Sequence, residues 1–297
     1  MKRAVVVLGT FSVALLMHRI LWLTPIYREL HGALPFYVAE SLKNLLELGL
    51  CVVALLAMGE RHIAGALGLD RRVFRGLAFG LACTAPMLIG FALTRRSDVH
   101  DPLAVAYLAF FAPFIEEAIS RGFAFRTLRR LGWPLWTAAA ACALLTGIAH
   151  VEKGQTAWSI LGLFWITGVG GFAFCWLVER WQSLWFPLAL HALMNFWWEV
   201  FNVAPTALGG WVAFTLQTAC ILIAIFVTLF LTPSRRGRLQ TIGEDRLGDR
   251  GELHVRRSLV DLSDLRVSPE LFHRIFFRVA VAAKNLHSSG CHALAHF

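Results

Sequence analysis

Apolar residues dominate the first 231 residues and fall into eight runs, most of them near the ~20 residues that a helix needs to cross a bilayer. The predicted spans are 4–23, 41–58, 73–93, 103–130, 135–151, 156–178, 184–202 and 210–231. The runs are continuous rather than alternating, which favours helices over the strands of a membrane barrel. The pattern therefore predicts an all-α fold, a polytopic transmembrane helix bundle of about eight spans.

The pattern changes after residue 231. The segment from Thr232 is polar, charged and dotted with glycine, which is typical of a partly disordered linker. Within it, residues 269–286 place apolar side chains at helical spacing, so an amphipathic helix is predicted there, either on the membrane surface or docked on protein. We expect a transmembrane domain over 1–231 and a cytoplasmic tail over 232–297.

The amino-acid composition is typical of a membrane protein and limits the classes of partner that we expect. Of the 297 residues, 57% are hydrophobic and only 16% are charged, so membrane lipids are the expected surroundings. The net charge is +9, but the arginines are scattered over short loops with no recognition module, which argues against nucleic-acid binding. Most basic residues fall on one side of the predicted bundle, so we expect both termini in the cytoplasm and the bundle in the inner (plasma) membrane.

Six cysteines occur, five of them inside apolar runs and none in a CxxC pair. We interpret them as small packing residues rather than disulfides or zinc ligands. The oligomeric state has no signature in the sequence.

One apolar stretch carries charge. The run FFAPFIEEAISRGFAF, residues 110–125, contains Glu116, Glu117 and Arg121. A charge at the centre of a membrane helix costs roughly 2.5–3.5 kcal/mol on insertion scales, so its presence needs a reason. Glu117 and Arg121 are four residues apart and can pair to hold helices together. A catalytic or binding role is the other explanation.

Two further spans carry polar groups. His150 lies near the end of the fifth span, and His191 and Asn195 lie four residues apart on one face of the seventh. If these helices converge with the Glu116 helix, the polar groups line one cavity.

Such a cavity can support hydrolysis. A desolvated carboxylate beside a second carboxylate accepts a proton from water near neutral pH. One histidine can orient that water, while His191 and Asn195 can donate to a developing oxyanion. Arg121 can hold the glutamates in place. The same Glu and His side chains also suit zinc, and their spacing does not separate the two chemistries.

The ordered set Glu116-Glu117-x-x-x-Arg121, His150 and His191-x-x-x-Asn195 resembles the CPBP intramembrane peptidases. This family is also called the CAAX-protease and bacteriocin-processing, or Abi, family. Context that resembles it includes Gly122 after the arginine, Gly147 before the first histidine, and the segment Ser183 to Pro187 before the second. The resemblance covers about 116–195.

The resemblance implies an intramembrane glutamic endopeptidase with a core at about 103–202 and no metal cofactor, zinc being the alternative. Glu116 would activate water, Glu117 would assist or pair with Arg121, and His150 would orient the same water. His191 and Asn195 would stabilise the oxyanion. The substrate would be a hydrophobic or lipidated peptide associated with the membrane.

Two positions depart from the family pattern. Ser120 stands where an aromatic residue is common before the arginine, and Thr146 stands where phenylalanine is common four residues before the histidine. Both are packing or lining positions, so the departures bear on substrate choice more than on catalysis.

Two other functions remain open at this point. A scaffold or a bacteriocin self-immunity protein of the same fold would need no catalysis, although the complete catalytic set argues against it. A proton-relay transporter would place polar groups along a through-path and show repeated halves, whereas the polar groups here form one cluster and no repeat is visible.

Overall fold

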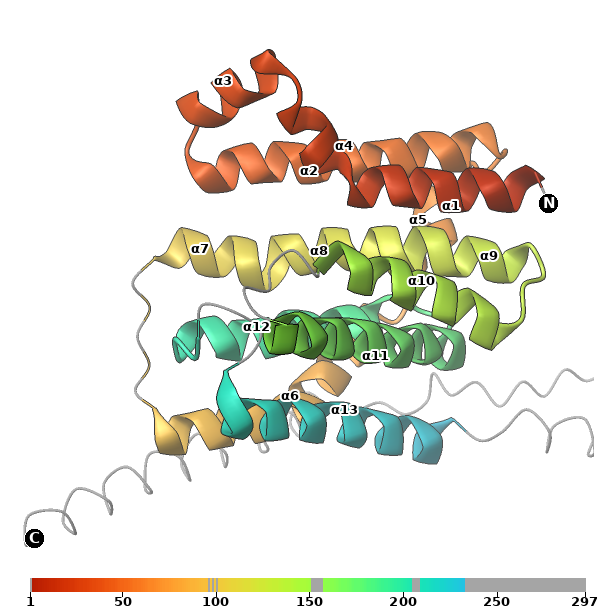
Figure 1. The fold of residues 1–297 in the computed structure, drawn as a ribbon. Helices are drawn as coiled ribbons and strands as arrows, with labels where there is room; N and C mark the ends of the chain where they lie inside the picture. The colour runs from red at the N-terminus through yellow and green to blue at the C-terminus, as the bar shows by residue number, and fades with distance from the viewer. Residues whose placement is uncertain are drawn as a thin grey trace, which may run out of the picture. The chain divides into compact units, whose positions relative to one another are not determined.

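The computed structural model describes residues 2–95, 97, 99, 101–150, 157–204 and 209–232 (Figure 1). Every regular element in these residues is helical, which confirms the all-α prediction. Of the predicted tail, 232–297, the structure describes Thr232; residues 233–297, with the helix predicted at 269–286, lie outside the described residues.

The helices follow the predicted spans closely in position. Their bounds are α1 Lys2–Leu15, α2 Met17–Trp22, α3 Pro25–Ala33, α4 Phe36–Ala57, α5 Ile63–Leu67, α6 Val73–Thr94, α7 Pro102–Ala106, η1 Tyr107–Phe111, α8 Ala112–Glu117, η2 Ala118–Phe125, α9 Arg126–Arg130, α10 Leu135–His150, α11 Ala157–Trp181, α12 Trp185–Val200 and α13 Gly210–Leu231.

The count of eight membrane spans is not confirmed. Among the described residues, four helices are long and apolar enough to cross a membrane: Val73–Thr94, Pro102–Arg130, Ile160–Trp181 and Gly210–Leu231. The predicted first span, 4–23, is not one helix, because Leu16 leaves helical geometry at ψ 2° and separates α1 from α2. Charged side chains keep α4 out of the apolar set, and α10 is shorter than a full crossing. The chain is a multi-pass membrane protein.

Two short helices, α3 and α5, have local sequence features that mark an end of each helix and that the prediction of membrane spans did not use. Thr24 caps α3 by accepting the amide N–H of Tyr27 at 3.4 Å, with Pro25 in the first turn. Gly68 ends α5 in the left-handed conformation, φ 81°, which glycine adopts without a steric penalty.

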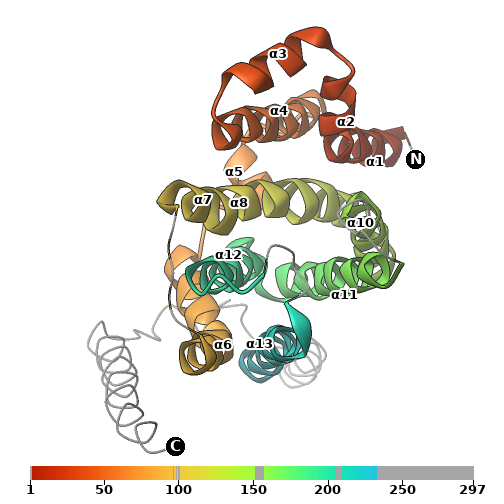
Figure 2. The same cartoon turned by 60° about the vertical axis from the view of Figure 1, so that its left-hand side comes forward.

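The central element is the continuous helix 102–130, built from α7, η1, α8, η2 and α9. Asp101 caps its start by accepting the amide N–H groups of Leu103 and Ala104, and Pro102 occupies the first turn. Helices α1 and α4 lie on one side of it, and α11 and α12 lie on the other (Figure 2). All eight residues of η2 are buried, so this helix forms much of the core.

Two π-helical segments, η1 and η2, flank the glutamates. Pro113 explains part of this departure from α geometry. In η1 the amide N–H of Ala112 bonds to the carbonyl of Tyr107, five residues back, and the same register would pair residue 113 with Leu108. Proline has no N–H to donate, so the Leu108 carbonyl is left for another partner.

The start of α12 is tied to the loop before α6. The amide N–H of Leu184 donates to the Gly68 carbonyl at 2.9 Å, and the Trp185 indole N–H donates to the Leu69 carbonyl at 2.9 Å. The Ser183 hydroxyl donates to the Arg71 carbonyl at 3.0 Å. These bonds fix the position and rotation of the first turn of α12. They therefore also fix the direction in which His191 and Asn195, further along the same helix, extend.

Helices α6 and α12 pack closely because glycine lines one contact face. A Cβ atom on Gly76 would lie 2.7 Å from the Trp185 backbone, and one on Gly80 would lie 2.8 Å from the Ala189 backbone. The order of these pairs means that the two helices run in the same direction. Small residues four apart allow such backbone approach in membrane helices.

We expect Gly80→Val to destabilise the protein by about 1–3 kcal/mol, because the new side chain would overpack the α6–α12 contact. Thermal unfolding in detergent measures the effect. Gly49→Val in α4 is the control, since a Cβ there meets nothing within 4 Å. Equal unfolding temperatures for the two variants would contradict the close packing.

Candidate active site

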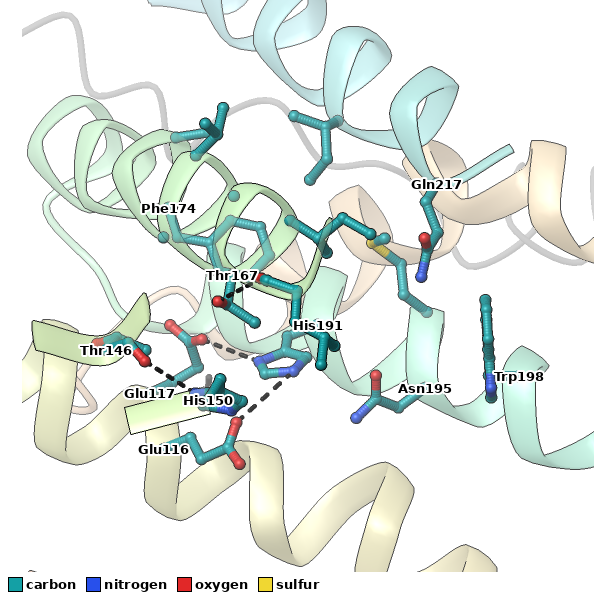
Figure 3. A pocket seen from close by; sticks show the side chains of 18 of the residues that line it. Glu116, Glu117, Thr146, His150, Thr167, Phe174, His191, Asn195, Trp198 and Gln217 are labelled. Carbon is teal, nitrogen blue, oxygen red and sulfur yellow. Dashed lines mark hydrogen bonds and ion pairs between the residues drawn. The ribbon is translucent and has the colours of Figure 1, made fainter. Parts of the chain in front are cut away.

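A cavity of about 800 Å³ lies between the central helix and α10, α11, α12 and α13. All six polar residues singled out in the sequence line it: Glu116, Glu117, Arg121, His150, His191 and Asn195. Figure 3 shows five of these side chains converging from three helices. The volume is in the range of small-molecule sites, which span about 300–1,000 Å³.

Glu117 is the buried centre of the charged cluster, with none of its side chain exposed. Its Oε1 accepts a hydrogen bond from Arg121 Nη1 at 2.9 Å and another from His191 Nδ1 at 2.9 Å. Two charged or polar donors on one oxygen compensate part of the cost of burying the carboxylate. Glu117 is therefore a buried part of the cavity wall that is engaged by its neighbours.

The wall behind Arg121 is shaped for its guanidinium. The group lies over the ring of Phe174, 5.3 Å from the centroid, and the same ring is 5.8 Å from the imidazole of His191. Gly171 leaves room for it, because a Cβ there would be 2.9 Å from Arg121 Nη2. The ring adds a cation–π contact to the ion pair.

Glu116 differs from its neighbour in exposure. Its side chain is 43% exposed, and its Oε2 lies 3.9 Å from His191 Nε2. Adjacent residues on a helix point about 100° apart, so one glutamate can face the core while the other faces the cavity. His191, which is 22% exposed, therefore lies between the two carboxylates: its Nδ1 faces Glu117 and its Nε2 faces Glu116.

The ring of His150 has a defined tautomer. Its Nδ1 is 2.9 Å from the carbonyl of Thr146, and a carbonyl only accepts, so Nδ1 carries the proton. In neutral His150 the lone pair is then on Nε2. The Thr146 hydroxyl lies 3.4 Å from the Ser120 hydroxyl, so the two departures from the family pattern meet each other inside the protein.

Asn195 is held by the carbonyl that Pro113 leaves open. Its Nδ2 donates to the Leu108 carbonyl at 3.0 Å, from α12 to η1. The side-chain amide has two N–H groups, and this bond uses one of them. The bond orients the second N–H and joins two helices of the site.

The cavity also has lining residues that the sequence analysis does not name as site residues. Thr167 and Phe174 come from α11, Glu199 from α12 and Gln217 from α13. Glu199 had a signal in its spacing of eight from His191, while Gln217 stands alone as an amide in an apolar helix. Among the described residues, no three His, Cys, Asp or Glu side chains are arranged to hold one metal ion.

We expect Arg121→Met to destabilise the protein by about 3–5 kcal/mol, because it leaves the Glu117 carboxylate buried without its cation. Combining it with Glu117→Gln should recover part of the loss, since the uncompensated charge is then gone. Thermal unfolding in detergent measures both variants.

The matched control is Arg130→Ala at the edge of the same helix. Arg130 Nη1 pairs with Glu60 Oε1 at 3.2 Å, but the two side chains are 35% and 39% exposed. An exposed pair contributes about 0–1 kcal/mol. A loss at Arg121 no larger than at Arg130 would contradict the structural role of the buried pair.

Residues 98–197 match the family described as type II CAAX prenyl endopeptidase Rce1-like. No curated protein and no solved structure matches the chain significantly. The matched segment contains both glutamates, Arg121, both histidines and Asn195. Residues 98–197 are therefore an Rce1-like domain of the CPBP/CAAX protease family.

Proposed function

We propose that this chain is an intramembrane endopeptidase of the glutamic type, in which Glu116 activates the attacking water. One observation carries the proposal. Of two adjacent carboxylates, Glu117 is buried and bonded to Arg121 and His191, whereas Glu116 is 43% exposed beside the cavity. The buried carboxylate positions the site, and the exposed one can exchange a proton with water.

In the first step, Glu116 accepts a proton from a water molecule while the water oxygen attacks the scissile carbonyl carbon. His150 receives the second water hydrogen in a hydrogen bond at Nε2, since its Nδ1–H is held by Thr146. The carbonyl π bond opens and its electron pair moves to the oxygen. That oxyanion accepts hydrogen bonds from Asn195 Nδ2–H and from protonated His191 at Nε2.

In the second step, the protonated Glu116 gives its proton to the amide nitrogen of the tetrahedral intermediate. The carbonyl forms again, the C–N bond breaks, and the products are a carboxylic acid and an amine. Glu116 returns to its starting state. Glu117 takes no part in the proton transfer, because Arg121 and His191 hold its Oε1 by charge-assisted hydrogen bonds.

The walls of the cavity support a hydrophobic or lipidated peptide as substrate. Leu222 on α13 and Val169 on α11 are apolar residues that line the cavity, and they are 60% and 48% exposed. A lipid-attached substrate can enter between such side chains. The name of the matched family points to prenylated CAAX peptides, and we take this as the first substrate class to test.

The positively charged side of the bundle supports an orientation with both termini in the cytoplasm of a plasma-membrane protein. Arg126 donates to the carbonyls of Gly65 and Ala66, and Arg72 donates to that of Trp181. These contacts gather arginines from distant parts of the sequence at one end of the bundle.

We expect Glu116→Gln to lower kcat by about 10²–10⁴-fold, the contribution of a general base, and to leave the unfolding temperature unchanged. The assay is cleavage of an internally quenched farnesylated CAAX peptide by the purified protein, beside an unprenylated hydrophobic peptide. Glu60→Gln, a carboxylate at the edge of the bundle, is the control.

Retained cleavage by Glu116→Gln would show that another group is the base. If neither peptide nor any membrane-extracted peptide is cleaved by the unaltered protein, the scaffold or self-immunity function replaces the peptidase.

Metal dependence has its own test, because zinc is the alternative cofactor. We expect cleavage to continue in the presence of 1,10-phenanthroline and to gain nothing from added zinc, since Glu116 supplies the proton transfer and His150 orients the water. Inhibition by the chelator that zinc reverses would overturn the metal-free mechanism.

A further inference from the structure

The cavity has a second polar position, far from the charged cluster in the view of Figure 3. Gln217 extends from α13 toward the face of α12 that carries Asn195 and Trp198, while Glu116 and Glu117 lie at the other end. Gln217 lies outside the matched segment 98–197, so the family match assigns nothing to it.

The carboxamide of Gln217 has an unmet hydrogen bond. In the described part of the chain, four buried side-chain atoms lack a partner: Tyr27 Oη, Glu117 Oε2, Arg121 Nε and Gln217 Oε1. Tyr27 does not line the cavity, and Glu117 and Arg121 bond to each other through their other atoms. Gln217 Oε1 is the remaining buried acceptor, and it belongs to a cavity wall.

A structural role does not account for this amide. Of the four apolar spans, α13 is the most apolar, and leucine would suit its position better than glutamine. Polar side chains in membrane helices usually bond across to a neighbouring helix. Gln217 Oε1 has no such bond among the described residues, although α13 packs on both α6 and α11.

We propose that Gln217 binds the backbone of the substrate peptide, accepting a hydrogen bond from one of its N–H groups at Oε1. The inference rests on the proposed function of the cavity. A neutral carboxamide carries one acceptor and two donors, which match the C=O and N–H along one edge of an extended peptide. A lipid chain offers no donor, so the peptide part of the substrate is the group that this amide recognises.

The surface between the two ends fits an extended chain. His191, Asn195 and Trp198 lie on one face of α12 at spacings of four and three residues. The Trp198 indole N–H already donates to the Ala204 carbonyl at 2.9 Å, so the ring presents an apolar surface to the cavity. A peptide with its scissile bond at Glu116 passes this surface and reaches Gln217.

The test compares Gln217→Met and Gln217→Leu with Thr215→Val, a polar residue of the same helix that does not line the cavity. We expect both Gln217 variants to raise KM for the cleaved peptide about tenfold with kcat retained, the loss expected for one net hydrogen bond. Thr215→Val should leave both constants unchanged. Thermal unfolding verifies that each variant is folded.

A set of peptides, each N-methylated at one backbone amide, identifies the bond directly. One methylated position should weaken binding to the unaltered protein about tenfold and have no further effect on Gln217→Met. If every methylated peptide loses the same affinity for the unaltered protein as for Gln217→Met, the hydrogen bond does not exist and the proposal is overturned.

Binding measured in the Glu116→Gln background separates this proposal from the peptidase itself. If the peptide binds and Gln217→Met weakens it, the inference stands even where no cleavage occurs. If Gln217→Met binds as tightly as its parent, the inference fails even where cleavage is normal.

Discussion

The buried carboxylate of Glu117 is the constraint around which the site is arranged. A fully buried charge requires partners, and it takes Arg121 from its own helix and His191 from α12. Each partner then constrains more of the structure. Arg121 needs the Phe174 ring and the space beside Gly171 on α11, and His191 needs α12 at a fixed distance and rotation. One ion cluster therefore holds three helices in register.

The backbone supports the same arrangement by a different route. Pro113 interrupts the hydrogen bonds of the central helix and leaves the Leu108 carbonyl to Asn195. Gly76 and Gly80 bring α6 against α12, and the loop at Gly68 and Leu69 holds the first turn of α12. With His191 and Asn195 placed in this way, Glu116 is the carboxylate left facing the cavity. Two consecutive glutamates in the same helical turn therefore have different environments.

Much of the fold and of the candidate site could be predicted from the sequence. Membrane helices are recognised by their apolar composition, and charged residues inside them are rare. The positions of the long helices and the set of Glu116, Glu117, Arg121, His150, His191 and Asn195 were accessible in this way. The break at Leu16 was not, since no proline or glycine marks it. The predicted count of about eight crossings is not confirmed, because only four of the described helices are long and apolar enough to cross a membrane and hydropathy does not separate a full crossing from a shorter apolar helix such as α10.

Other features depend on tertiary contacts that no local pattern encodes. The bond of Asn195 to Leu108 requires both a π-helical register and a proline at one position in it. The unmet acceptor of Gln217 becomes visible only when its neighbours are known. The proposed division of labour between Glu116 and Glu117 was suggested by the resemblance, and the different exposure of the two side chains supports it.

The central claim is that water, activated by Glu116, attacks the scissile carbonyl without a covalent intermediate. The most direct test is a single turnover in water labelled with a heavy oxygen isotope. Mass spectrometry then locates the heavy oxygen in the new carboxylate of the product and in the enzyme peptide that contains Glu116. If Glu116 acts as a base, the product carries the label and Glu116 carries none. Label in Glu116, with an unlabelled product from the first turnover, would mean that the carboxylate attacks the substrate itself, and it would contradict the mechanism.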